Sequence, residues 1–183
     1  CELAVLLLLP ELPEVETVRK GLEKHLKNFY IQRIEVLKER SIASIGGSRS
    51  FIDNIKSSYL GNWERRGKYL IGSLQSQNKI SKGYLVVHLR MTGQFILLEK
   101  HINPCAHTRV RFLEKNGKEL RFIDIRNFGQ MWYVPSSKSV SEIVSGIKRL
   151  GPEPFSEAFN SSYLEKYLKN RTRSIKSSLL DQE

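Results

Sequence analysis

Seven short runs of β-branched and aromatic residues fill the middle of the chain, and they constrain its fold more than any other feature. Such side chains are enriched in β-strands, because they fit a pleated, half-buried surface. Several short strands at this spacing predict an antiparallel sandwich or barrel. The runs lie between about Ile31 and Val134 and read IQRIEV, YLIGSL, GYLVVHLRM, GQFILLE, TRVRFLE, ELRFIDI and GQMWYV.

Turn signals separate some of these runs. In TRVRFLEKNGKELRFIDI, two alternating strands flank Asn116 and Gly117. An Asn-Gly pair favours a two-residue hairpin turn, in which both central residues adopt positive φ. The stretches 40–50 and 75–82 are rich in Ser, Gly, Gln and Asn, and we expect them to be loops.

Helical patterns lie on both sides of the strand-rich region. Between Glu14 and Lys27, apolar residues recur at helical spacing, and Pro13 is well placed as the first helical residue. After a Ser-rich connection at 136–145, LGPEPFS interrupts any regular element, and SEAFNSSYLEKYL restarts a helical pattern. The sequence predicts an α+β fold, with an antiparallel β-sandwich flanked by helices and followed by a truncated helical domain.

The formal net charge of +11 is concentrated in two segments. Clustered Lys and Arg suit a polyanion, because each phosphate contact releases condensed counterions. Charge alone is equally compatible with a solvated, solubilising surface. Against the single acid Glu64, residues 56–90 contain Lys56, Arg65, Arg66, Lys68, Lys79, Lys82 and Arg90, and the acid-free segment 166–176 contains Lys166, Lys169, Arg171, Arg173 and Lys176.

Cysteine content and the first residues bear on compartment. Cys1 and Cys105 make no disulfide framework and no tetrahedral zinc site by themselves, which favours a reducing cytosol. The apolar run from Leu3 to Leu9 has no basic residue before it and no cleavage site, and it is too short to span a bilayer. We expect neither a signal peptide nor a membrane helix.

The doublet Pro10-Glu11 could carry chemistry. A proline at a chain terminus is a secondary amine that can attack a sugar carbon and form a Schiff base, and a neighbouring carboxylate can move the protons. Glu14 lies one helical turn beyond. The alternative is an ordinary helix N-terminus, where Pro and Glu are both favoured.

A series of motifs favours the chemical interpretation. PELPEVETVRKGL resembles the opening of the bacterial formamidopyrimidine-DNA glycosylases, and it is followed in family order by WERRGKYL, HLRMTG, HTRVRF, DIRNFGQ, LGPEPF and KNRTRSIKSSLLDQ. The resemblance covers residues 10–183. It implies a bifunctional repair enzyme of the bacterial cytoplasm and nucleoid. Such an enzyme excises oxidised purines from double-stranded DNA as a monomer, and then cleaves the strand at the abasic site.

The resemblance also assigns roles to individual residues. Pro10 would be the nucleophile at the deoxyribose C1′, Glu11 the proton carrier and Glu14 a supporting carboxylate. Lys68 and His88 match positions that hold phosphates beside the damaged nucleotide, and Lys176 matches a basic position near the DNA.

A second group would act on the DNA stack. Met91, Arg126 and Phe128 match residues that fill the gap left by the extruded base. An apolar wedge and an arginine for the orphaned partner base offset the cost of unstacking. By themselves, Met91 and Phe128 are more typical of core fillers and Arg126 of a solvated surface charge, and only the motif context favours the other interpretation.

The chain departs from the family pattern at both ends. Residues 1–9 form an extension before the proline, residues 10–140 match the catalytic β-sandwich domain, and residues 141–183 match a linker and an incomplete helix-two-turns-helix domain. The family's structural zinc belongs to a C-terminal finger that this chain lacks, so we expect no cofactor here. A catalytically silent DNA-binding fragment remains an alternative. So does a sibling glycosylase for oxidised pyrimidines, although Leu12 favours the purine branch.

The ligand inventory leads to a prediction about zinc. With two cysteines and four histidines scattered among different predicted elements, the chain offers no four-ligand set with zinc-finger spacing. We expect chelator-washed protein to contain no stoichiometric zinc by atomic absorption. A molar equivalent of zinc would show that this ligand assignment is wrong.

Overall fold

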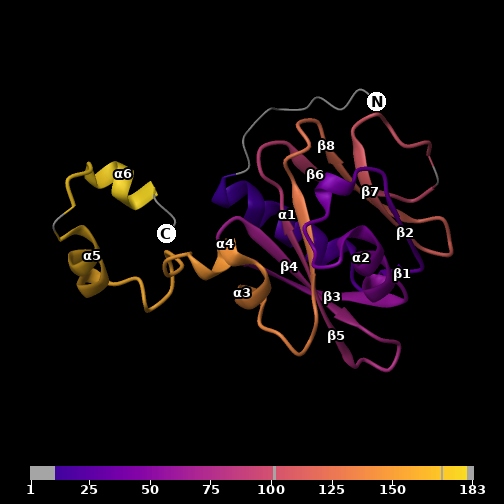
Figure 1. Cartoon of the computed structure of the whole chain (residues 1–183), viewed down its shortest axis with the longest axis horizontal. Coiled ribbons are helices and arrows are strands. Elements are labelled where there is room, and N and C mark those ends of the chain that lie inside the picture. Colours follow the sequence, from indigo (N-terminus) through magenta and orange to yellow (C-terminus); the bar gives the residue numbers. More distant parts are fainter. Residues whose placement is uncertain (1–10, 101, 170, 181–183) are drawn as a thin grey trace.

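Two antiparallel sheets packed face to face form the body of the protein (Figure 1). The computed structural model describes residues 11–100, 102–169 and 171–180. One sheet has five strands in the order β1-β3-β4-β5-β9, and the other has four in the order β2-β7-β8-β6. Neighbouring strands in both sheets run antiparallel. The predicted α+β class and the antiparallel sandwich are confirmed.

Within the described residues, the strands β3 to β9 follow one another without an intervening helix, and helices lie before and after them. The strands are β1 Tyr30–Ile31, β2 Arg33–Val36, β3 Ser58–Arg66, β4 Tyr69–Gln75, β5 Ser81–His88, β6 Gly93–Leu98, β7 Thr108–Leu113, β8 Glu119–Asp124 and β9 Gln130–Val134. The helices are α1 Leu12–His25, α2 Gly47–Ile55, α3 Val140–Ile143, α4 Ser145–Lys148, α5 Ser161–Leu168 and α6 Ile175–Leu180, with the 3-10 helix η1 at Glu39–Ser41.

The first helix covers one end of the sandwich. Pro13 lies in its first turn, where a missing N–H costs no hydrogen bond, and Glu14 complements the helix dipole there. Its buried Val15 and Leu22 join the main core between the sheets. The remaining members of that core come mostly from both sheets and α2, and the large ones include Phe51, Trp63, Phe112 and Phe122.

A second, smaller core lies on the outer face of the five-stranded sheet. Val144, between the short helices α3 and α4, and Ile147 of α4 pack there against Tyr69, Val86 and Val134. Figure 1 shows α5 and α6 standing apart from the sheets at one end of the molecule, beyond the chain segment that follows α4.

Four details correct the sequence-based assignment. IQRIEV is two strands, because the chain passes from one sheet to the other between Ile31 and Arg33. The prediction missed β3, in which a bulge between Leu60 and Trp63 breaks the alternating pattern. The predicted loop at 40–50 contains the start of α2. The predicted loop at 75–82 is shorter, since β4 ends at Gln75 and β5 begins at Ser81.

The predicted hairpin between β7 and β8 exists, but its turn is of another kind. Gly117 has a φ of 88°, whereas Asn116 is not among the described residues with positive φ. The Glu114 N–H donates to the Lys118 carbonyl, and the Gly117 N–H donates to the Glu114 carbonyl. This pattern is that of a three-residue loop, which needs only one left-handed residue.

The described chain contains no helix that is both long enough and apolar enough to cross a membrane.

Phe112 gives a test of the core. Its side chain is fully buried and its ring centre lies 6.4 Å from that of Phe51. Phe112→Ala should lower the free energy of unfolding by roughly 3–5 kcal/mol in urea denaturation, because it leaves a cavity between the sheets. Ile80→Ala, at a position 65% exposed in the β4–β5 turn, is the control and should change little.

Candidate active site and adjoining rim

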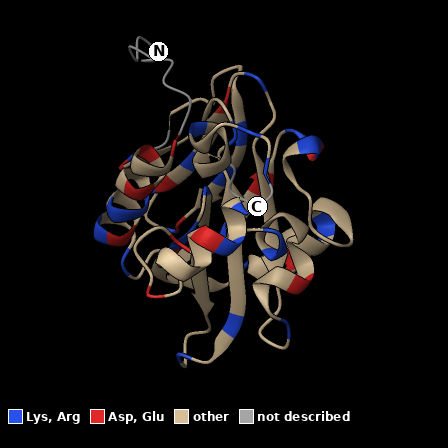
Figure 2. Cartoon of the chain, turned by 90° about the vertical axis from the view of Figure 1, so that its left-hand side faces the viewer, with Lys and Arg blue, Asp and Glu red and all other residues tan. Residues whose placement is uncertain are grey.

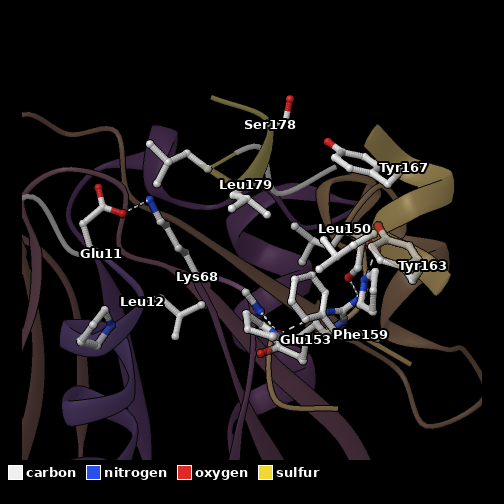
Figure 3. A pocket seen from close by; sticks show the side chains of 18 residues that line it. Glu11, Leu12, Lys68, Leu150, Glu153, Phe159, Tyr163, Tyr167, Ser178 and Leu179 are labelled. Carbon is white, nitrogen blue, oxygen red and sulfur yellow. Dashed lines mark hydrogen bonds and ion pairs between the residues drawn. The ribbon is translucent and has the colours of Figure 1, made fainter. Parts of the chain in front are cut away.

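The beginning of α1 and the β3–β4 turn bring two predicted site residues together. Glu11 precedes α1 as its N-cap residue, and its Oε2 atom lies 2.6 Å from the Nζ atom of Lys68. Lys68 follows Gly67, whose φ of 54° makes the turn possible. Figure 3 shows the two side chains facing one another at one end of a cavity. Pro10, the predicted nucleophile, lies outside the described residues.

Glu14 lies one turn further along α1 and is half-buried. Its Oε2 atom is inaccessible to solvent and finds no hydrogen-bond donor in the part of the chain that the structure describes. A carboxylate oxygen in that situation is costly, and such atoms recur at functional sites.

Glu153, from the segment after α4, fixes the turn that carries Lys68. Its carboxylate accepts hydrogen bonds from Arg65 Nη2 at 2.8 Å, Arg66 Nη1 at 3.1 Å and the Gly67 N–H at 2.6 Å. Burial alone would raise the pKa of Glu153, but the bonds from Gly67, Arg65 and Arg66 outweigh it and lower that pKa. Glu153 is therefore ionised and holds the turn rigidly.

A cavity of about 450 Å³ opens between this turn and the C-terminal helices. Glu11 and Lys68 provide its charged end. Figure 3 shows apolar and aromatic side chains at the other end, among them Leu150, Phe159 and Tyr163. A charged pair at the edge of an apolar cavity is a common arrangement in binding and catalytic sites.

His88 lies at the end of β5, next to Lys68. Its Nδ1 atom accepts a hydrogen bond from the Arg90 N–H at 3.0 Å, and its ring meets the Tyr69 ring edge-on. Burial, followed by the charges of Arg90 and Lys68, lowers the pKa of His88 to about 4. His88 is therefore neutral at pH 7, and since Nδ1 is an acceptor, its proton is on Nε2.

The three residues predicted to act on the DNA stack lie on two loops that the topology places side by side. Met91 is on the β5–β6 loop, and Arg126 and Phe128 are on the β8–β9 loop. Both loops pass from one sheet to the other, and β5 pairs with β9 while β6 pairs with β8. We call Met91, Arg126 and Phe128 the rim.

The rim is exposed and basic. Phe128 is 39% exposed, and guanidinium carbons lie 5.1 Å (Arg126) and 5.4 Å (Arg40) from its ring centre. A hollow of about 420 Å³ beside it is lined by Arg40, Arg90, Met91, Phe128 and Gln130. Phe128 is thus a surface residue, and Met91, which is half-buried, lines the hollow and belongs to neither core.

Sequence reasoning missed Glu153 and Arg40, because neither position carries a signal in the residue pattern. The sequence pattern of LGPEPF indicates a break between elements, yet its glutamate, Glu153, accepts a hydrogen bond from the β3–β4 turn and holds it in place. Lys176, by contrast, was predicted; it lies exposed on α6 and does not line the cavity.

Figure 2 shows the side of the molecule on which α5 and α6 lie, with Lys and Arg positions spread over helices, strands and loops. Within residues 11–100, 102–169 and 171–180, no group of three or more His, Cys, Asp or Glu side chains is placed to hold a metal ion. No step below uses a metal.

Comparisons with known proteins agree on one family. A family model described as "Formamidopyrimidine-DNA glycosylase N-terminal domain" matches residues 9–131. A formamidopyrimidine-DNA glycosylase of Prochlorococcus marinus (strain NATL1A) is 80% identical over 174 residues, which are 95% of this chain and 62% of the relative. Its counterpart in Parasynechococcus marenigrum (strain WH8102) is 52% identical over 174 residues, 95% of this chain and 61% of that relative.

Solved structures extend the comparison to DNA complexes. A Lactococcus lactis formamidopyrimidine-DNA glycosylase bound non-covalently to DNA with an AP site has a TM-score of 0.81 and 29% identity. The match covers 94% of this chain and 63% of that one. The chain thus spans about three-fifths of the length of the relatives that it matches.

The low pKa of His88 makes stability depend on pH. Because the folded protein binds this proton less tightly than the unfolded chain, stability should fall as the pH drops from 6.5 towards about 4. The difference between the pKa values of His88 in the unfolded and the folded protein corresponds to at most about 3 kcal/mol of unfolding free energy. His88→Gln should flatten this part of the profile in urea unfolding, whereas His25→Gln, at an exposed position on α1, should not. Parallel profiles for His88→Gln and the unchanged protein would contradict the assignment.

Proposed function

This chain belongs to the formamidopyrimidine-DNA glycosylase family, and on that basis we propose that it acts in base-excision repair of double-stranded DNA. Its substrates are oxidised purines such as 8-oxoguanine and formamidopyrimidines. The reaction is excision of the base followed by cleavage of the strand through elimination at the abasic site. We further propose that the enzyme works as a monomer in the bacterial cytoplasm, at the nucleoid.

The observation that carries the proposal is the pairing of Glu11 and Lys68 at the start of α1. A terminal Pro10 nitrogen would form a bond to C1′ while the bond from C1′ to the base breaks. The Glu11 carboxylate, on the adjacent residue, takes up the proton that the amine loses and can pass it on. Lys68 holds that carboxylate in place and presents a cation for a flanking phosphate.

The same surface offers further DNA contacts. His88 can donate from Nε2 to a phosphate oxygen without carrying a charge. Met91 and Phe128 would enter the stack where the damaged base leaves, and Arg126 would meet the base that remains. Lys176 on α6 would bind backbone on the other side of the cavity.

Two alternatives are tested with the same protein. The first is DNA binding without excision, which requires the phosphate contacts alone. Action on oxidised pyrimidines is favoured by one similar structure, a Lactococcus lactis complex with DNA that contains an oxidised pyrimidine. The substrates should therefore include both kinds of lesion.

Borohydride trapping gives the test, because it reduces a Schiff base to a stable covalent adduct. Protein that begins at Pro10 should be trapped on a duplex containing 8-oxoguanine, and protein that retains residues 1–9 should not. The reason is that the nitrogen of an internal proline is an amide. Pro10→Gly should retain some adduct, since glycine also offers a terminal amine, and Lys68→Ala should reduce it.

Each variant should be made in two lengths, ending at residue 183 or continued with the part of the Prochlorococcus relative that this chain does not span. An adduct from the longer form alone, with binding by both, would assign the chain as given to DNA binding without excision. An equal adduct from protein shown to retain residues 1–9 would exclude Pro10 as the nucleophile.

A further inference from the structure

The exposed rim is attached to the sandwich by one buried carboxylate. Asp124, the last residue of β8, is fully buried. Its Oδ2 atom accepts a hydrogen bond from the Gly129 N–H at 2.7 Å, and its Oδ1 atom accepts one from the hydroxyl of Thr92. The first bond closes the β8–β9 loop from beginning to end, and the second reaches the loop that carries Met91.

Thr92 continues this connection. Its hydroxyl oxygen also accepts the Arg126 N–H at 3.1 Å. A backbone N–H can only donate, so the hydroxyl proton is left for Asp124, and the direction of both bonds is fixed. Met91 precedes Thr92 in sequence, and Arg126 and Phe128 lie between Asp124 and Gly129. Every rim residue is thus within two positions of a group in this network.

The backbone of both rim loops is held in unusual conformations. Arg90 and Asn127 each have a φ of 56°, in the left-handed region that non-glycine residues rarely adopt. Such conformations persist only where the surroundings determine them, and they cluster at functional sites. Position 129 has no room for a side chain, because a Cβ there would lie 2.6 Å from Phe122 Cζ and 3.0 Å from Asp124 Oδ2.

We propose that Asp124 and Thr92 are positioning residues that hold Met91, Arg126 and Phe128 in one fixed arrangement before DNA is bound. This inference rests on the proposed function. Ordering a loop on binding costs free energy, which lowers the affinity for DNA and slows extrusion of the base. A rim that is already ordered can enter the stack as soon as the protein meets the duplex. The pair touches neither substrate nor reacting atoms and acts through the three rim residues.

The test separates base extrusion from DNA binding. The full chain is mixed with a duplex that contains 8-oxoguanine next to 2-aminopurine, whose fluorescence rises when its neighbour leaves the stack, and binding is followed by anisotropy on the same duplex. Thr92→Val should lower the extrusion signal about tenfold while binding stays within about twofold, because the loss of the hydroxyl frees Arg126 and leaves buried polar groups unpaired. Thr92→Ser, which keeps the hydroxyl, should restore the signal.

Thr108→Val is the matched control. Thr108 is a second buried threonine, whose hydroxyl contacts Cys105 Sγ on another loop, and its replacement should leave extrusion unchanged. Asp124→Ala should reproduce Thr92→Val, and Asp124→Asn should retain part of the signal because an amide can still accept from Gly129. When Phe128→Ala is combined with Thr92→Val or with Asp124→Ala, the extrusion signal should fall little further, since both changes in each double variant act through the same rim.

A measurement without DNA tests the geometry alone. In the free protein, exchange of the Arg126 and Gly129 amide hydrogens should be slow, and Asp124→Ala should accelerate both. Normal extrusion by Thr92→Val and Asp124→Ala, equal losses from Thr108→Val, or unprotected amides would each overturn the positioning role. If the unchanged protein binds the duplex without extruding the base, the proposed function fails, and the task assigned to the pair fails with it.

Discussion

The arrangement of the site depends on the carboxylate of Glu153. It is the common acceptor for Arg65, Arg66 and the Gly67 N–H, so the segment after α4 is attached to the β3–β4 turn at three points. Arg66 adds hydrogen bonds to the carbonyls of Leu150 and Gly151. Removing the carboxylate would leave Arg66 and the Gly67 N–H without this acceptor, and Arg65 with Glu16 as its remaining acid partner. What resembles a flexible linker in the sequence is therefore a fixed connection, and the position of Lys68 relative to the cavity follows from it.

The rim depends on a different constraint, which is the pairing of strands within each of the two sheets. Met91 and Phe128 are 37 positions apart, and no local pattern connects them. They meet because the chain changes sheets after β5 and again after β8. The strands before the first crossing and after the second, β5 and β9, are paired, and so are β6 and β8. The active-site end and the rim are then joined through β5, whose last residue is His88.

The sequence predicted the sandwich and most of its strands, because alternation and β-branched composition are local properties. It failed at β3, where a bulge disrupts the alternation, and at α2, whose beginning is rich in Gly and Ser. The roles of Glu11, Lys68 and the rim came from family motifs, and their proximity is a property of the fold. Asp124 and Glu153 lie within the motifs DIRNFGQ and LGPEPF, but their tasks could not have been found, since a buried carboxylate that closes a loop is indistinguishable in the sequence from a solvated one.

The structure also changes the meaning of the positive charge. Three of the seven cations in the segment 56–90 are paired with acids: Arg65 with Glu16 and Glu153, Arg66 with Glu153, and Lys68 with Glu11. Arg111 and Arg121 likewise surround Glu119, where burial would raise the carboxyl pKa but their hydrogen bonds lower it to about 2. Arginine suits this task because its planar fork satisfies a buried carboxylate with several bonds. Because Glu16, Glu119 and Glu153 hold arginines in place, those arginines add little outward charge, which is left to other exposed Lys and Arg side chains such as Arg126.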